Sequence, residues 1–92
     1  RTRLQIIYDI LKVVQEHEEK IKPTQIIYKA NLSHEMLEEY LSELLSKNFV
    51  IEQTTKRGKT YKLTDKGCAY ISKYALITDF VESFGLVPEN DA

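Results

Sequence analysis

The sequence predicts a mainly α-helical fold with a small β-hairpin and a long C-terminal helix. Apolar residues recur at helical spacing in four segments, and two β-prone runs flank the short tip "KRG". Capping and turn residues separate these segments. The chain has 92 residues, of which 42% are hydrophobic and 29% charged, a composition typical of one folded domain. Because so small a core is only marginally stable, a partner chain would help the fold.

The N-terminal part of the chain predicts two helices joined by a polar segment. The first is expected from Arg3 to about Glu18, where apolar residues form a broad buried face: Leu4, Ile6, Ile7, Ile10, Leu11, Val13 and Val14. Pro23 has the fixed φ and missing N–H that suit a first helical turn, so a short second helix is expected over about 23–30. Asn31 tolerates a left-handed turn, and Ser33 is a good N-cap for the next helix.

The third helix is expected from His34 to Lys47. Its buried stripe consists of Leu37, Tyr40, Leu41, Leu44 and Leu45. Helical geometry places Glu35, Glu39, Ser42 and Ser46 on the opposite face, with Glu38 and Glu43 at its flanks. This acidic face is the one that would meet DNA in a helix-turn-helix. Glu35, Glu39 and Glu43 form a like-charge row, which Lys47 relieves in part by pairing with Glu43.

The C-terminal part predicts a hairpin and a fourth helix. The runs "FVIEQTT" and "KTYKLT" are β-prone, and "KRG" between them forms a basic tip. Thr64 is the expected N-cap of a helix that continues to about Phe84, where Gly85 and Pro88 stop it. Residues 87–92 are expected to be a disordered tail.

The predicted order of three helices, a hairpin and a further helix is that of a winged helix-turn-helix. Residues 1–64 then form the winged helix-turn-helix domain, and residues 65–86 form a C-terminal helix suited to dimerisation.

Composition and motifs exclude several classes of protein. One cysteine excludes an internal disulfide, and the two histidines lack zinc-site spacing, so no metal is expected. No catalytic constellation or phosphate-binding loop is present, so we expect no enzyme, no cofactor and no small-molecule ligand. No apolar run is long enough to span a bilayer, and the first residues do not form a signal peptide, which favours a cytoplasmic protein.

The charge is unevenly distributed along the chain. A net charge of −1 and a pI near 6.1 argue against a general polyanion binder. Residues 54–74, however, hold six basic side chains against Asp65 alone, whereas residues 75–92 hold four acidic side chains and no basic one. The basic charge is therefore concentrated around the hairpin.

Four stretches of the chain carry a resemblance to a known family: "IIYDIL", "KPTQIIYKANLS", "YLSELLSKNFV" and "YKLTDKG". They resemble small archaeal winged-helix proteins, regulator-like or chromatin-associated, that pair through a C-terminal helix. The resemblance implies binding of double-stranded DNA as a homodimer, with the third helix at the major groove and the wing on the backbone. The acidic face of the third helix departs from the family, in which this face is usually basic or neutral.

The candidate DNA-binding residues gather at the hairpin and at the helix ends. A basic tip can track phosphates or enter a minor groove, and the first turn of the third helix offers free N–H groups. The candidates are Lys22, Lys29, Ser33, His34, Lys56, Arg57, Lys59 and Lys62, with Arg1 and Arg3 as possible extensions of the basic track. The alternative for the hairpin is that its charges serve solubility and discourage edge pairing.

Three further side chains are expected to serve structure. Tyr28 and Tyr40 stand at core spacing on their helices, which favours packing over base stacking. Cys68 is expected to be buried and inert at the start of the fourth helix.

The fourth helix predicts an assembly surface. Its a/d seam begins at Gly67 and supplies the predicted dimer interface, Tyr70, Tyr74, Ile77, Val81 and Phe84. A second apolar set, Ile71, Leu76 and Phe80, widens the helix beyond what one small domain covers. Homodimerisation through a coiled coil is the expected arrangement. The alternative is a helix that folds back over helices one and three of its own chain.

The leading functional hypothesis is a transcriptional regulator or nucleoid-associated protein that binds double-stranded DNA as a homodimer through its wing and helix termini. The alternative is a protein-interaction winged helix whose acidic third helix meets a basic partner without DNA binding. In both hypotheses the protein binds a partner and catalyses no reaction.

Overall fold

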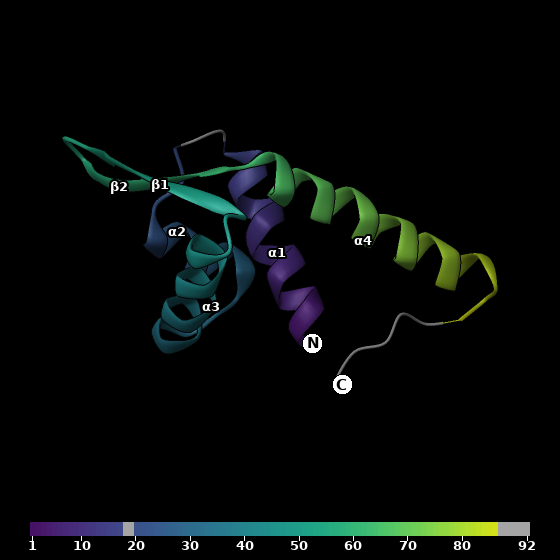
Figure 1. The fold of residues 1–92 in the computed structure, drawn as a ribbon. Coiled ribbons are helices and arrows are strands. Elements are labelled where there is room, and N and C mark those ends of the chain that lie inside the picture. The colour runs from purple at the N-terminus through teal and green to yellow at the C-terminus, as the bar shows by residue number, and fades with distance from the viewer. Residues whose placement is uncertain (18–19, 87–92) are drawn as a thin grey trace.

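The computed structural model describes residues 1–17 and 20–86 and contains the predicted order of elements (Figure 1). The hairpin and the last helix project in opposite directions from a body of three helices (Figure 1). Both the predicted disordered tail and Glu18, the expected end of the first helix, lie outside the described residues. The elements are α1 (Arg3–Glu16), α2 (Pro23–Ala30), α3 (His34–Ser46), β1 (Val50–Thr55), β2 (Gly58–Leu63) and α4 (Asp65–Ser83).

Side-chain caps fix where the helices begin. The Ser33 hydroxyl accepts the Met36 N–H at 3.1 Å at the start of α3, and the Thr64 hydroxyl accepts the Gly67 N–H at 3.1 Å at the start of α4. Asn31 ends α2 in the left-handed conformation with φ 55°. These three local predictions from the sequence are confirmed.

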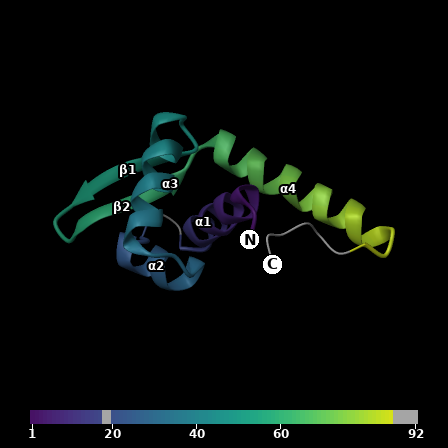
Figure 2. The ribbon, with the colours of Figure 1, turned by 90° about the horizontal axis from the view of Figure 1, so that it is seen from below.

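The hydrophobic core is built around α1, which lies between the α2–α3 pair and α4 (Figure 2). Ile10 and Leu11 of α1 have no exposed surface, and Ile21, Ile26 and Leu44 close over them from other parts of the chain. The expected burial of Leu4 is wrong. Its side chain is 54% exposed because it lines an open groove beside Ile77 and Val81 of α4 instead of packing into the core.

The hairpin is anchored at one end and free at the other. β1 and β2 pair antiparallel from Val50–Leu63 to Thr55–Gly58, which leaves Lys56 and Arg57 as a two-residue turn. Val50 and Tyr61 are buried at the inner end, where a bridge between Ile21 and Tyr61 joins the hairpin to the segment before α2. The tip therefore extends beyond the core (Figure 1).

A close backbone approach joins α4 to the end of α3. The Thr64 N–H donates to the Phe49 carbonyl oxygen at 3.1 Å, and the Thr64 hydroxyl donates to the Asn48 carbonyl oxygen at 2.6 Å. A Cβ on Gly67 would lie 2.4 Å from the Phe49 oxygen. Gly67 was predicted to begin the dimer seam. It is instead buried against this backbone, where only glycine fits without movement of the chain.

Aromatic contacts dock the first half of α4 on α1. Tyr74 stacks on Tyr8 with ring centroids 4.7 Å apart, and the Tyr70 hydroxyl donates to the Leu4 carbonyl oxygen at 2.6 Å. Burial raises the pKa of Tyr70 to about 12. Ile71, predicted as part of an outer apolar set, belongs to the core at 6% exposure.

The second half of α4 extends past α1 into solvent. Its large apolar side chains are between 58% and 68% exposed: Leu76, Ile77, Phe80 and Phe84. The alternative in which the whole helix folds back over its own chain therefore holds only for the first half. Among the described residues, no helix is both long and apolar enough to cross a membrane.

Gly67→Ala should destabilise the protein by about 1–3 kcal/mol, because the new methyl group overlaps the Phe49 carbonyl and forces the backbone apart. Urea denaturation followed by circular dichroism measures this free energy of unfolding. Cys68→Ala is the matched control, since its side chain is exposed on the same helical turn and should change stability by less than about 0.5 kcal/mol. Equal stability of the two variants would contradict the close-approach interpretation.

Candidate nucleic-acid interface

The turn between α2 and α3 is held by backbone and side-chain hydrogen bonds. The Leu32 N–H donates to the Ile27 carbonyl oxygen at 3.0 Å as the chain leaves α2. The Arg1 guanidinium donates to the carbonyl oxygens of Ala30 and Asn31 at 2.6 and 2.7 Å and pairs with Asp9 at 2.9 Å. Arg1 therefore fixes this turn instead of extending the basic track.

The start of α3 lies beside the hairpin. Ser33 and His34 are exposed, and His34 lines a hollow of about 380 Å³ together with Pro23, Glu38, Lys59 and Tyr61. Of the predicted DNA-binding residues, the structure thus brings His34 and Lys59 to one place from two separate elements. Lys29 stands exposed on the last turn of α2.

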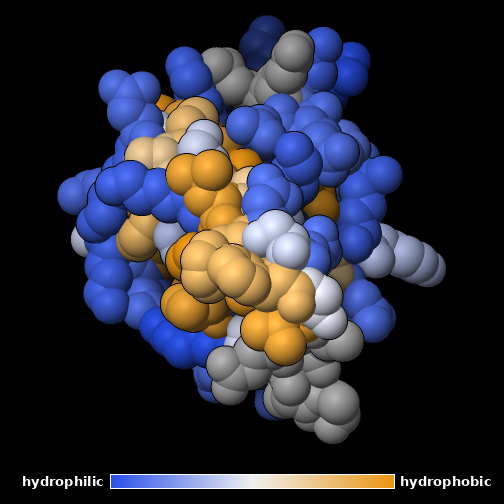
Figure 3. All heavy atoms as spheres, turned by 90° about the vertical axis from the view of Figure 1, so that its right-hand side faces the viewer, coloured by the Kyte–Doolittle hydropathy of each residue, from blue (hydrophilic) through white to orange (hydrophobic). Residues whose placement is uncertain are grey.

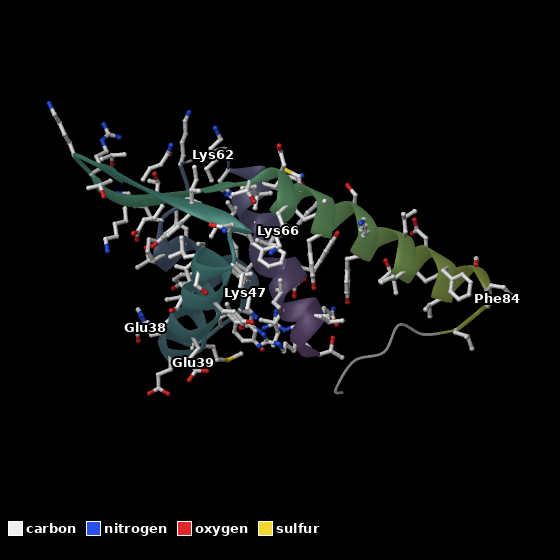
Figure 4. The ribbon with its side chains drawn as sticks, viewed as in Figure 1. Glu38, Glu39, Lys47, Lys62, Lys66 and Phe84 are labelled. Atoms are coloured by element: carbon white, nitrogen blue, oxygen red, sulfur yellow. The ribbon has the colours of Figure 1, made fainter. Side chains whose placement is uncertain are left out.

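The outer face of α3 is acidic, as the sequence predicted. Glu35, Glu38 and Glu39 are exposed, and Glu38 and Glu39 point away from the core (Figure 4). A carboxylate on this face repels phosphates, and it can accept a base hydrogen bond only from an amino group, most commonly that of cytosine. This face cannot supply general affinity for DNA.

Glu43, expected at the flank of that face, is turned away from it toward α1. Its carboxylate pairs with Arg3 of α1 and with Lys47 at 2.7 Å, and its side chain is only 27% exposed. These hydrogen bonds, first from Arg3 and then from Lys47, lower the pKa of Glu43 to about 2. The predicted Glu43–Lys47 pair is confirmed, while the Arg3 contact turns the carboxylate toward α1.

Arg3 likewise serves the fold and not the basic track. Besides its pair with Glu43, its guanidinium lies 5.6 Å from the centre of the Tyr40 ring. The Glu43 carboxylate raises the pKa of Arg3, which keeps its charge in the pair. Tyr40 is half-buried against this guanidinium, which confirms packing as its role.

The hairpin tip presents its cations to solvent. Lys56 and Arg57 are exposed at the turn, and the Arg57 N–H donates to the Thr55 hydroxyl at 3.2 Å. Lys59 lies 3.5 Å from the Glu52 carboxylate across the strands, which offsets part of its charge. Lys62, nearer the inner end, points away from α3 (Figure 4).

A second hollow, of about 450 Å³, gathers cations that sequence reasoning did not combine. Lys22, Lys56 and Arg57 line it together with Lys20. Thr55 and Thr60 complete its described lining. The sequence carries little signal for Lys20, because Glu18 and Glu19 precede it, and only the fold brings Lys20 and Lys22 to the hairpin.

Two expectations about single side chains are wrong. Tyr28 is 89% exposed, because the turn of α2 that carries it faces solvent and not α3. Cys68 is exposed, because Gly67 and Ile71 take the inward positions of that part of α4.

Comparison with known proteins agrees with this geometry. A model of the winged helix-turn-helix family matches residues 1–82. The chain belongs to the winged helix-turn-helix family. The hairpin is its wing, and α2 and α3 are the paired helices of the motif. An uncharacterised protein of Methanocaldococcus jannaschii is 36% identical over 73 residues, which are 79% of this chain and 32% of that protein. The chain thus spans about a third of the length of this relative.

Solved structures share the fold. Sso10a-2, a DNA-binding protein from Sulfolobus solfataricus, superposes with a TM-score of 0.78 at 24% identity and covers 91% of this chain and 85% of its own. MepR from S. aureus in complex with DNA gives a TM-score of 0.71 at 15% identity, covering 92% of this chain and 63% of MepR. A MepR mutant bound to an oligodeoxyribonucleotide gives 0.74 at 16% identity, with coverages of 94% and 65%.

Glu43→Gln should make the melting temperature depend less on pH in the acid range. A carboxyl group whose pKa is lower in the folded protein stabilises the fold above its unfolded pKa, and this stabilisation is lost as the pH falls through the folded pKa. For Glu43 the loss runs from about pH 4.5 down to about pH 2. Thermal melting at several pH values in this window measures it. Ser42→Ala, at an exposed position of the same helix and without an ionisable group, should keep the wild-type slope. A slope unchanged by Glu43→Gln would contradict the ion-pair assignment.

Proposed function

We propose that this protein binds double-stranded DNA as a homodimer, through the wing and the helix termini, as a transcriptional regulator or nucleoid-associated protein. The observation that most strongly supports this proposal is the pair of exposed cations, Lys56 and Arg57, on a tip that projects beyond the core. The DNA-binding description of Sso10a-2 and the DNA complexes of MepR support the proposal. The protein acts by binding, without chemistry, and a chromosomal target places it in the cytoplasm of a prokaryotic cell.

The DNA contact joins the wing to the start of α3. His34 and Lys59 line one hollow with Glu38, so a phosphate held there meets an exposed imidazole, an ammonium and the helix N-terminus, with the Glu38 carboxylate opposing it. The wing tip reaches the neighbouring backbone or minor groove, where Arg57 is well suited to a narrow groove. Ser33 lies at the same helix end, and Lys22, Lys29 and Lys62 extend the positive surface.

The acidic face of α3 then stays off the backbone. Glu35 lies in the first turn of α3, where its charge stabilises the positive end of the helix dipole. Together with Glu38 and Glu39, however, it penalises a deep approach to phosphates. This repulsion contributes to selectivity, because only a sequence that offers base amino groups in register, such as those of cytosine, lessens it.

The free half of α4 supports homodimerisation. Apolar side chains gather on the side of the molecule where this helix ends (Figure 3), with Leu4, Ile77, Phe80 and Phe84 all more than half exposed. A helix segment that projects into water without tertiary contacts is marginal, so this surface calls for a partner. Leu4, Tyr74, Ile77 and Val81 line a groove of about 390 Å³ that an apolar side chain of a second copy fills.

Pairing through α4 sets the spacing of the two wings. Tyr70 and Tyr74 pack on their own α1, so the interface centres on Ile77, Val81 and Phe84, with the tyrosines at its inner edge. A two-fold dimer of this kind presents two wings and two α3 helices at a fixed separation, which matches a pseudo-palindromic site.

A protein-interaction module is the second candidate function. Its supporting observation is the face of α3, where Glu35, Glu38 and Glu39 stand exposed, with Tyr28 of α2 89% exposed as well. Carboxylates and an exposed tyrosine suit a basic protein surface.

Changing Lys56, Arg57 and Lys59 together to Ala should weaken duplex binding and lower the slope of log affinity against log salt by about 3, about one unit for each lost phosphate contact. Fluorescence anisotropy of a labelled duplex at several salt concentrations measures both. Lys73→Ala removes one cation from α4 at a distance from the wing and should leave the slope unchanged.

The same titration separates the two candidate functions. Unchanged affinity and salt slope in the triple variant would rule out the wing as the DNA contact. Absence of duplex binding by the wild-type protein at low salt would favour the protein-interaction module.

Ile77→Asp should convert the protein to a monomer without unfolding it, because the side chain is 58% exposed in the single chain but lies in the proposed interface. Sedimentation equilibrium gives the mass, and circular dichroism reports the helix content. Ser72→Asp adds the same charge at an exposed position off the seam and should leave the dimer intact. A dimer mass in the Ile77 variant would rule out this interface.

A further inference from the structure

The hollow between the wing and the segment before α2 has the chemistry of an anion site. Four cations line it, from two parts of the chain: Lys20 and Lys22 on one side and Lys56 and Arg57 on the other. The described lining contains no carboxylate. Cations held close together repel one another, and a bound anion relieves that repulsion.

Thr60 provides an independent observation at the same place. Its residue is 6% exposed, and its hydroxyl is buried without a hydrogen-bond partner among the described residues. Buried hydroxyl groups nearly always have a partner, and an unmet one costs free energy. Thr60 also lines the hollow, so a ligand there can accept its O–H hydrogen bond.

This hollow is separate from the one beside α3. Successive residues of a strand point to opposite faces, so Lys59 and Tyr61 face α3 while Thr60 and Lys62 face away from it. Lys62 points away from α3 in Figure 4, in agreement with this alternation. The two hollows therefore use opposite faces of the wing and share none of their lining residues.

We propose that this hollow binds a phosphate group, with Thr60 as the buried donor and Lys20, Lys22, Lys56 and Arg57 as the charged partners. A phosphate carries enough negative charge for several cations, and its oxygens accept the two parallel hydrogen bonds of a guanidinium. A volume of about 450 Å³ lies in the range of small-molecule pockets, so the site has room for more than the phosphate itself.

The phosphate has two possible sources, a free phosphorylated small molecule or the backbone of bound DNA. Lys56 and Arg57 belong both to this hollow and to the proposed DNA contact. A free ligand that occupies them competes with DNA for the wing tip, whereas a backbone phosphate in the hollow adds to the DNA contact. This distinction rests on the proposed DNA binding, but the phosphate site itself does not.

The test is a titration of the full chain, without DNA, with inorganic phosphate and pyrophosphate at constant ionic strength. Two-dimensional NMR of the backbone amides reports the location, and saturable shifts are expected at Lys20, Lys22, Arg57 and Thr60. Thr60→Val keeps the shape and removes the donor, so affinity should fall about tenfold while the melting temperature does not fall.

Two sets of lysine substitutions test whether the cations of the hollow hold the phosphate. Changing Lys20 and Lys22 together to Gln should abolish saturation, whereas Lys73→Gln, an exposed cation on α4, should leave it unchanged. Shifts that do not saturate, or wild-type phosphate affinity in Thr60→Val, would overturn the proposal.

A DNA arm identifies the source of the phosphate. Wild-type duplex affinity in Thr60→Val, together with weaker duplex binding by the wild-type protein in pyrophosphate, assigns the site to a small molecule. Weaker duplex binding by Thr60→Val assigns it to the DNA backbone. Both results support the phosphate site, and a wild-type protein that binds phosphate without binding DNA separates this proposal from the proposed function.

Discussion

The close approach of α4 to the backbone at Phe49 fixes the directions of the two projecting elements. The Phe49 carbonyl oxygen receives the Thr64 N–H, and Gly67 lets the first turn of α4 lie against it. The wing leaves this point on one side and α4 on the other (Figure 1). Lys66 adds a hydrogen bond to the Lys47 carbonyl oxygen at 2.9 Å, with its ammonium 4.5 Å from the centre of the Phe49 ring. One backbone junction thus sets the angle between the basic tip and the apolar helix face.

Some charged side chains of the chain form ion pairs and hydrogen bonds that stabilise the fold, and others are exposed to solvent. Arg1 and Arg3 hold the turn after α2 and the carboxylate of Glu43, so these cations stabilise the arrangement of α1, α2 and α3. The exposed carboxylates of α3 and the exposed cations of the wing then stand on neighbouring elements with opposite sign (Figure 4). The net charge of the chain, which is near zero, does not reveal this separation. An approaching polyanion responds to the local electrostatic potential of the wing and not to the net charge of the whole chain.

In the proposed homodimer, the apolar half of α4 sets the positions of the two basic wings. Stacked rings of Tyr8, Tyr70 and Tyr74 dock the first half of α4 on α1, next to the exposed second half. Because the wing is tied to the start of the same helix, the proposed interface would determine the distance between two wings. The proposed assembly and the proposed DNA contact thus share one helix.

The sequence by itself determined the elements, because helix periodicity, caps and turns act over a few residues. Pro23, Asn31, Ser33 and Thr64 predicted their boundaries, and the cations of a two-residue turn were bound to be exposed. Only the tertiary structure decided which face each side chain meets. It exposed Tyr28 and Cys68, and it placed Gly67 against a carbonyl. It also paired Arg3 with Glu43 and brought Lys20 and Thr60 to one hollow beside the wing. Those outcomes depend on contacts between residues far apart in the chain, which no local pattern records.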